Sequence, residues 1–283
     1  MPVNDELGTR MKNFYENVPK FRLYRRTPVA IRIDGKAFHT FTKGFQKPFD
    51  EVLVKSMQDT MKYLCENIQG CVLGYTQSDE ITLILVDYKK LNNDAWFDYE
   101  IQKVCSIAAS MATMAFNRFF TSKVKAFIFN NGENYERNSK EAILCEVYRN
   151  AVNKGAMFDA RCFNIPKEEV ANLIYWRQLD ATRNSIQMVG QANFSHNELQ
   201  NKSCNMIQDM LFQKKGINWN DFQTYLKRGS CCIKKYEITD IVSNKGQIFS
   251  AVPRSYWFID TEIPIFKNKG RDYIEQLIQP EEE

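Results

Sequence analysis

Three acidic residues lie next to stretches of sequence that look suited to a protein interior. Asp79 and Glu80 stand in YTQSDEI, between the apolar runs CVLG and ITLILV. Asp34 ends the β-branched run TPVAIRID and is followed by Gly35. Carboxylates that share one site repel each other unless a cation lies between them, and Mg²⁺ prefers hard oxygen ligands. Asp34 and Asp79 are therefore candidate magnesium ligands for phosphoryl transfer.

The segments around these acids predict elements that bring them together. Alternating β-branched residues indicate a strand over 27–35, and two apolar runs around Gln77–Glu80 indicate a β-hairpin with a four-residue turn. The segment 49–70 has the apolar spacing of an amphipathic helix, and 103–120 is apolar on nearly every face, as in a buried helix. A hairpin lying beside the first strand would place Asp79 near Asp34.

The order β-α-β-β-α predicts an α+β protein with a polymerase-palm or ferredoxin-like antiparallel sheet and its helices on one face. Candidate closing strands are KAFIFN (125–130), AILCEVYR (142–149) and MFDARCFNI (157–165). We expect a palm-like catalytic region over 1–150. Residues 151–283 would form a helical and β extension that completes the fold and contacts nucleic acid.

Composition limits the class of protein. The 283 residues are 44% hydrophobic, which suffices for a large core, and the net charge of +4 suits a local patch for a polyanion. No apolar run reaches the roughly 18 residues of a membrane span, so we expect a cytoplasmic protein without membrane contact. Eight cysteines without a CxxC pair, and only two histidines, favour reduced core thiols over a zinc site.

Each acidic motif alone also fits ordinary turn chemistry, because Asp-Gly often ends a strand and Ser-Asp is common in turns. The metal interpretation depends on both motifs lying at one edge of the sheet, with Lys36, His39 and Lys47 in the loop between them.

Six motifs occur in order: RIDGKAFHTF, KPFD, GYTQSDE, FDAR, YWRQLD and YLKRG. Together they resemble the tRNA-His guanylyltransferase family and its bacterial and archaeal relatives, the 3′-to-5′ polymerases, over roughly residues 20 to 235. The resemblance implies two magnesium ions held by Asp34, the carbonyl of Gly35 and Asp79. It also implies a nucleoside triphosphate over the segment Asp34, Gly35, Lys36, Ala37, Phe38, His39 and against Ser78. Glu80 is expected to support the metal site.

The implied reaction has two stages. ATP first activates the 5′ end of a tRNA by adenylyl transfer, and the 3′-hydroxyl of an incoming GTP or other nucleotide then attacks that end. Family members are commonly tetramers, so a homotetramer is expected.

Other residues match the family singly. Lys47 corresponds to a lysine that contacts triphosphate, His39 to a histidine near the nucleotide, and Lys103 to a lysine in 5′-end activation. Arg32 matches a family arginine, although an ion pair to Asp34 is an equal alternative. Lys47 and Lys103 could otherwise be solvated surface charges.

Two positions depart from the family. An arginine pair before Lys103 is replaced by Tyr99 and Glu100, which puts the triphosphate contact there in doubt. The eukaryotic HINNLYN signature is replaced by TRNSIQM, Thr182 to Met188, with only Asn184 identical. This loss resembles the bacterial and archaeal subgroup and implies templated repair of truncated tRNA 5′ ends. Untemplated guanosine addition to tRNA-His is the alternative.

More remote alternatives are a palm-type nucleotide cyclase and a non-catalytic RNA-binding module. The cyclase leaves YWRQLD to YLKRG unexplained, and the module lacks RNP1 aromatics, because KGF at 43–45 continues with QKP. Basic residues remote from the acids suggest a tRNA-binding patch, although solvated charges are equally expected: Lys214, Lys215, Lys227, Arg228, Lys234 and Lys235. Arg22, Arg25 and Arg26 are the second choice.

Overall fold

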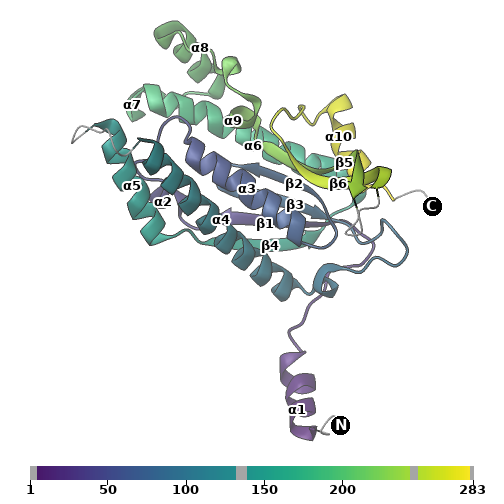
Figure 1. Cartoon of the computed structure of the whole chain (residues 1–283). Coiled ribbons are helices and arrows are strands. Elements are labelled where there is room, and N and C mark those ends of the chain that lie inside the picture. Colours follow the sequence, from purple (N-terminus) through teal and green to yellow (C-terminus); the bar gives the residue numbers. More distant parts are fainter. Residues whose placement is uncertain (1–4, 132–138, 243–247, 281–283) are drawn as a thin grey trace.

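A computed structural model describes residues 5–131, 139–242 and 248–280. At its centre is a six-stranded sheet in the order β4-β1-β3-β2-β5-β6 (Figure 1), with every neighbouring pair antiparallel. The strands are β1 (Val29–Gly35), β2 (Cys71–Gln77), β3 (Glu80–Leu85), β4 (Phe158–Asn164), β5 (Ser230–Val242) and β6 (Ile248–Asp260).

The sequence β1-α3-β2-β3-α4-β4, with strand order β4-β1-β3-β2, is a ferredoxin-like arrangement. Its two helices are α3 (Glu51–Asn67) and α4 (Ile101–Asn131). The predicted fold class, an antiparallel sheet with its helices on one face plus a C-terminal extension of helices and strands, is therefore confirmed, except that the extension places helices on the other face as well.

The remaining helical segments lie before, between and after these elements. They are α1 (Glu6–Met11), η1 (Lys12–Glu16), α2 (Phe38–Phe41), η2 (Trp96–Tyr99), α5 (Lys140–Lys154), α6 (Lys167–Asn193), α7 (His196–Leu199), α8 (Cys204–Lys215), η3 (Trp219–Asp221), α9 (Thr224–Arg228), η4 (Asn268–Arg271), α10 (Asp272–Glu275) and η5 (Gln276–Ile278). Helix α1 stands away from the sheet and buries none of its side chains (Figure 1).

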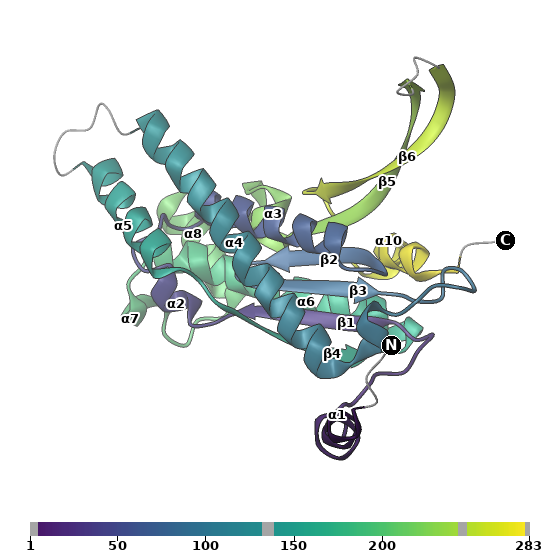
Figure 2. The ribbon, with the colours of Figure 1, turned by 60° about the horizontal axis from the view of Figure 1, so that its bottom comes forward.

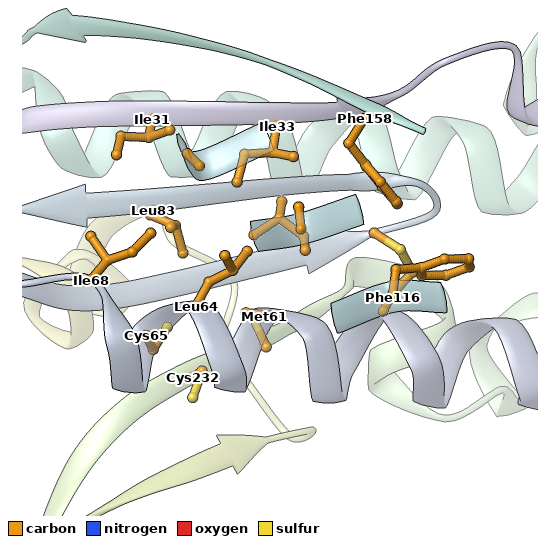
Figure 3. Close-up of a cluster of buried hydrophobic side chains, with 14 of the residues drawn as sticks. Ile31, Ile33, Met61, Leu64, Cys65, Ile68, Leu83, Phe116, Phe158 and Cys232 are labelled. Atoms are coloured by element: carbon orange, nitrogen blue, oxygen red, sulfur yellow. The ribbon is translucent and has the colours of Figure 1, made fainter. Parts of the chain in front are cut away.

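Helices α3 and α4 cover one face of the sheet (Figure 3). Ile31 and Ile33 of β1 and Leu83 of β3 point to this face, because alternate residues of a strand share a side. They meet Met61, Leu64 and Cys65 of α3 and Phe116 of α4, all buried. The intervening residues Arg32, Asp34, Glu80 and Thr82 therefore belong to the opposite face.

The C-terminal extension supplies the cover for that opposite face. Ala30, Leu73 and Ile84 of the sheet form one buried cluster with residues of α6, α10, η5 and the segment before η4. The helices thus lie on both faces of the sheet, and not on one face as predicted. Helices α3 and α4 form the first layer, and the helices after residue 166 form the second. Strands β4 and β5 also come from 151–283 and pair with β1 and β2, so the two predicted regions share one sheet.

Two of the three candidate closing strands are wrong. Residues 125–130 continue α4, and 142–149 lie in α5; only 157–165 contains a strand, β4. The side chains buried in α5 are Cys145, Tyr148 and Ala151, which recur every third residue as on one face of a helix. A short run of alternating apolar residues is compatible both with one face of a helix and with one face of a strand.

Strands β5 and β6 form a long hairpin that curves away from the rest of the sheet (Figure 2). All eight cysteines are free, and five of them are buried, in line with the predicted reduced thiols. Among the described residues, no helix combines the length and hydropathy required to span a bilayer.

Candidate active site

Pairing of β1 with β3 brings the predicted acidic residues to one edge of the sheet. Asp34 lies opposite Glu80, and the amide of Gly35 donates to the carbonyl of Asp79 at 3.1 Å. The hairpin turn has two residues, Ser78 and Asp79, and not the predicted four, because Gln77 and Glu80 are still paired. Ser78 adopts a left-handed conformation with φ 50°, which is typical of tight two-residue hairpins.

An open pocket of about 480 Å³ lies between this edge, the loop from 35 to 50 and α6. Of the predicted site residues, Asp34, Gly35, Ala37, Phe38, His39, Lys47, Ser78 and Asp79 line it. Lys36, Glu80 and Lys103 do not. The volume falls within the roughly 300 to 1,000 Å³ typical of ligand pockets.

The segment after β1 is fixed by one aromatic anchor. Phe38 is 5% exposed and packs against Phe41, Phe116 and Phe158. A Cβ added to Gly35 would lie 2.2 Å from Cδ2 of Phe38, so only glycine fits beside this ring. Ala37 has φ 53° at the turn into α2. Backbone groups of 35–38 are thereby held along the pocket wall.

The electrostatics of the turn favour a cation. Burial raises the pKa of Asp79 to about 6, the charges of Asp34 and Glu80 add to the increase, and the hydrogen bond from Ser78 opposes it. A divalent ion between Asp34 and Asp79 would offset both the burial and the repulsion. Among the described residues, no group of three or more His, Cys, Asp or Glu side chains forms a metal centre. Two carboxylates fit magnesium, which takes its other ligands from water and phosphate.

Glu80 faces away from the pocket. Its Oε1 lies 3.4 Å from Nη2 of Arg32, and its Oε2 accepts from Arg177 of α6. Both carboxylate oxygens of Glu80 therefore face an arginine. Arg32 makes its ion pair with Glu80, and not with Asp34 as one alternative held.

Lys103 lies at the other end of the molecule from the pocket. It sits in the first turn of α4, with Nζ 4.8 Å from the centre of the Phe97 ring. Backbone hydrogen bonds join this end of α4 to residues 21–23, before β1, whereas Asp34 stands at the far end of β1. Tyr99 is buried and Glu100 pairs with Arg22 across an isolated bridge, so both replacements have structural contacts here.

Sequence reasoning missed several residues of the pocket wall, among them Asp50, Leu53 and Met188. Asp50 is the N-cap of α3 and accepts from the amides of Gln46 and Leu53 and from Tyr148. Its signal was present, since an aspartate before an apolar helical run is a typical N-cap.

A smaller, more enclosed pocket adjoins the first. Asp50, Leu53, Ser78 and Met188 line both, and Asn184 lines the smaller one. The TRNSIQM segment lies within α6, and its side chains face different sites. Gln187 lines a separate pocket together with His196, and Arg183 pairs with Asp180.

The predicted basic patch is divided among three elements. Lys214 and Lys215 end α8, and Lys234 and Lys235 are exposed on β5. Lys227 is 7% exposed and donates to the carbonyl of Asn220, so it is not a solvated charge. Of the alternative set, Arg25 pairs with Asp87 and Asp98, and Arg22 pairs with Asp98.

Several known proteins are similar to this chain in sequence and in fold. The family model described as tRNAHis guanylyltransferase matches residues 8–166. A bacterial tRNA(His) guanylyltransferase-like protein, solved with ATP, is 39% identical, with a TM-score of 0.75 over 96% of this chain and 99% of its own. The same description with GTP gives 39% identity and a TM-score of 0.71 over the same shares. The tRNA(His) guanylyltransferase of Saccharomyces cerevisiae is 28% identical over 75% of this chain and 85% of its own.

The family match covers more than half of the chain, and the bacterial relative is similar over almost all of it. The strand edge that carries Asp34 and Asp79 lies inside the matched range. The chain therefore belongs to the tRNAHis guanylyltransferase family.

Proposed function

We propose that this protein is a nucleotidyltransferase that extends the 5′ end of a tRNA in the 3′-to-5′ direction. The observation that carries the proposal is the meeting of Asp34 and Asp79 at one strand edge above an open pocket. ATP would activate the 5′ phosphate, and the 3′-hydroxyl of GTP or another nucleotide would then displace the activating group. The nucleotide complexes of the bacterial relatives support these substrates.

Asp34, Asp79 and the carbonyl of Gly35 are proposed to hold two Mg²⁺ ions. When bound, the ions supply positive charge that neutralises phosphate oxygens during displacement. Two acids alone leave coordination positions for triphosphate oxygens. Because the side chain of Glu80 is engaged by two arginines, we assign it no direct contact with the ions.

The loop between β1 and α3 is proposed to bind the nucleotide. Lys47 and His39 line the pocket and are exposed, so both can reach a triphosphate. The carbonyl and amide groups of 35–38, fixed by Phe38, and the hydroxyl of Ser78 complete the contact surface. Positioning of this kind contributes much of the catalysis in phosphoryl transfer.

We propose templated repair of truncated tRNA 5′ ends as the cellular reaction. Two features support it: TRNSIQM stands where the family resemblance places the eukaryotic HINNLYN, and identity is 39% to the bacterial relative against 28% to the yeast enzyme. Untemplated guanosine addition to tRNA-His remains the second candidate, favoured by the curated relatives' own names.

The exposed lysines of the β5–β6 hairpin and of the α8 terminus are proposed to contact tRNA phosphates. Lys103 is far from the pocket within one chain, so its proposed part in 5′-end activation requires the RNA to reach the other end of α4 or a second copy of the chain. A homotetramer would allow the latter.

The direct test is incorporation of labelled nucleotide into a 5′-phosphorylated tRNA that lacks its first residue, with and without magnesium. A nucleotidyltransferase extends the RNA only with the metal. A cyclase would convert the free nucleotide and leave the RNA unchanged, and a binding module would retain the RNA without extending it.

A further inference from the structure

A buried arginine links the edge of the sheet to the helix behind it. The side chain of Arg177, in α6, is only 4% exposed, and its Nη2 donates to Oε2 of Glu80 and, at 3.0 Å, to Oδ2 of Asp180. Its guanidinium carbon lies 4.6 Å from the centre of the Trp176 ring. Removing the guanidinium would take the arginine partner from Oε2 of Glu80 and from Oδ2 of Asp180, two carboxylates whose side chains are 20% exposed.

Each carboxylate oxygen of Glu80 pairs with an arginine on the face of the sheet that α6 covers. Oε1 faces Arg32, whose guanidinium carbon lies 5.3 Å from the centre of the same Trp176 ring. Oε2 faces Arg177. In addition, the carbonyl of Glu80 accepts from the hydroxyl of Thr76 at 2.8 Å. The first residue of β3 is therefore fixed through its side chain and its backbone.

Glu80 lies next to the two proposed metal ligands, so its pairing with arginines affects the metal site. It directly follows Asp79 and lies opposite Asp34 in the β1–β3 pair, yet it does not line the pocket. A free carboxylate at this position would be a third acid within reach of the two proposed metal ligands. It would compete for the ions and add negative charge beside the triphosphate.

We infer that Arg177 is a positioning residue: it holds Glu80 against α6, so that the metal ions meet two carboxylates, Asp34 and Asp79, and not three. The inference rests on the proposed function, because it concerns the same metal site. One nitrogen of Arg177, Nε, has no hydrogen-bond partner among the described residues. Its hydrogen bonds are made by Nη2, to Glu80 and Asp180, although an unsatisfied buried donor such as Nε costs free energy.

The test combines Arg177→Met with Glu80→Gln in a double-mutant cycle. Mn²⁺ binding is measured by calorimetry in the presence of a non-hydrolysable ATP analogue, alongside single-turnover addition and thermal unfolding. Arg177→Met is expected to bind Mn²⁺ about tenfold more tightly, because a third carboxylate becomes able to reach the ions. It should add nucleotide at least about tenfold more slowly, a loss within the range typical of residues that orient metal ligands. Adding Glu80→Gln should return Mn²⁺ affinity to the wild-type value, because the competing carboxylate is gone.

Arg183→Met is the matched control. Arg183 also pairs with Asp180, but its side chain is 61% exposed and it makes no ion pair with Glu80, so Mn²⁺ affinity should stay at the wild-type value. Arg177→Lys, which keeps a charge but not the planar fork, covers the case in which Arg177→Met does not fold, and should shift Mn²⁺ affinity in the same direction.

Unchanged Mn²⁺ affinity in folded Arg177→Met or Arg177→Lys overturns the inference and leaves the proposed function standing. The same holds if Glu80→Gln fails to restore affinity, or if only thermal stability falls, because Arg177 then acts as a structural residue. Wild-type protein that binds no Mn²⁺ and extends no tRNA overturns both.

Discussion

At the scale of single residues, Asp34 and Asp79 are distinguished from other acids on the same edge by the pocket that they line. Replacing either by alanine removes a proposed metal ligand at the rim of the sheet without opening the core. We expect each variant to lose more than the roughly 100-fold that removal of a residue supporting a metal ligand can cost. Nucleotide addition under single-turnover conditions measures the loss, and circular dichroism verifies the fold.

Asp159→Asn is the control for this experiment. Asp159 lies opposite Asp34 on β4, so it shares the end of the sheet, but it does not line the pocket and pairs with Arg161. Its replacement should leave addition within about twofold of wild type, as expected for an exposed surface substitution. Equal losses in all three variants would mean that general negative charge, and not ligation, is required.

The residues of the site could be predicted unequally from the sequence. Asp34 and Asp79 were predictable because each lies at the end of a strand or in a hairpin turn that the local residue pattern indicates. Pairing of those strands then places the two acids close together. The partner of Glu80 was not, since Arg177 is separated from it by 97 positions and reaches it only because α6 covers the second face. Met188 was missed for the same reason, as it enters the pocket from that helix.

At the scale of elements, Asp50 links the loop that carries Lys47 to the start of α3. Burial raises the pKa of Asp50, although hydrogen bonds from Leu53, Tyr148 and Gln46 oppose the increase. Because the folded-state pKa lies above the unfolded value, the folded protein holds a proton that the unfolded chain has lost. The resulting contribution of Asp50 to the free energy of unfolding is full below the unfolded pKa of about 4. It is lost as pH rises through the folded-state pKa.

Asp50→Asn keeps a good N-cap but cannot titrate. The variant should therefore be most destabilised, relative to wild type, near pH 4, and the difference in free energy of unfolding should shrink toward pH 7. Urea unfolding at a series of pH values in metal-free buffer measures it. Tyr148→Phe, which retains the carboxylate, should keep the wild-type direction of the pH dependence; a difference for Asp50→Asn that grows with pH would contradict the account.

Element types were harder to predict where segments were short. In 125–130 and 142–149, a few alternating apolar residues fit both a strand and one side of a helix. Phe116, Phe120 and Val124 belong to one continuous buried face of α4. This face indicates a helix for 125–130 only when the whole of 101–131 is considered. The hairpin around Ser78 was recognised because its two runs are bounded by turn residues.

At the scale of the whole molecule, the exposed lysines of β5 are far along the sheet from β1, with β3 and β2 between them. Lys234→Ala combined with Lys235→Ala should weaken tRNA binding and reduce its salt dependence, by a slope of about 0.7 to 0.9 for each phosphate that the protein no longer neutralises. Nucleotide affinity should not change. Filter binding over a range of salt concentrations, with ATP-analogue calorimetry, separates the two effects.

Lys62→Ala combined with Lys123→Ala provides a control of equal charge, because both lysines are already paired, with Glu66 and Asp59. It should leave the salt slope near that of the wild type. An unchanged slope in the β5 variant would place the RNA elsewhere, with the α8 terminus as the next candidate.

The central claim is tested most directly by sequencing the product made on a tRNA that lacks its first nucleotide. All four bases are placed in turn opposite the gap, in a histidine tRNA and in a non-histidine tRNA, with ATP, magnesium and all four nucleotides present. We predict that the added base is the complement of the template base in every case and on both tRNAs. Guanosine added regardless of the template, or extension of the histidine tRNA alone, would contradict templated repair and favour guanosine addition to tRNA-His.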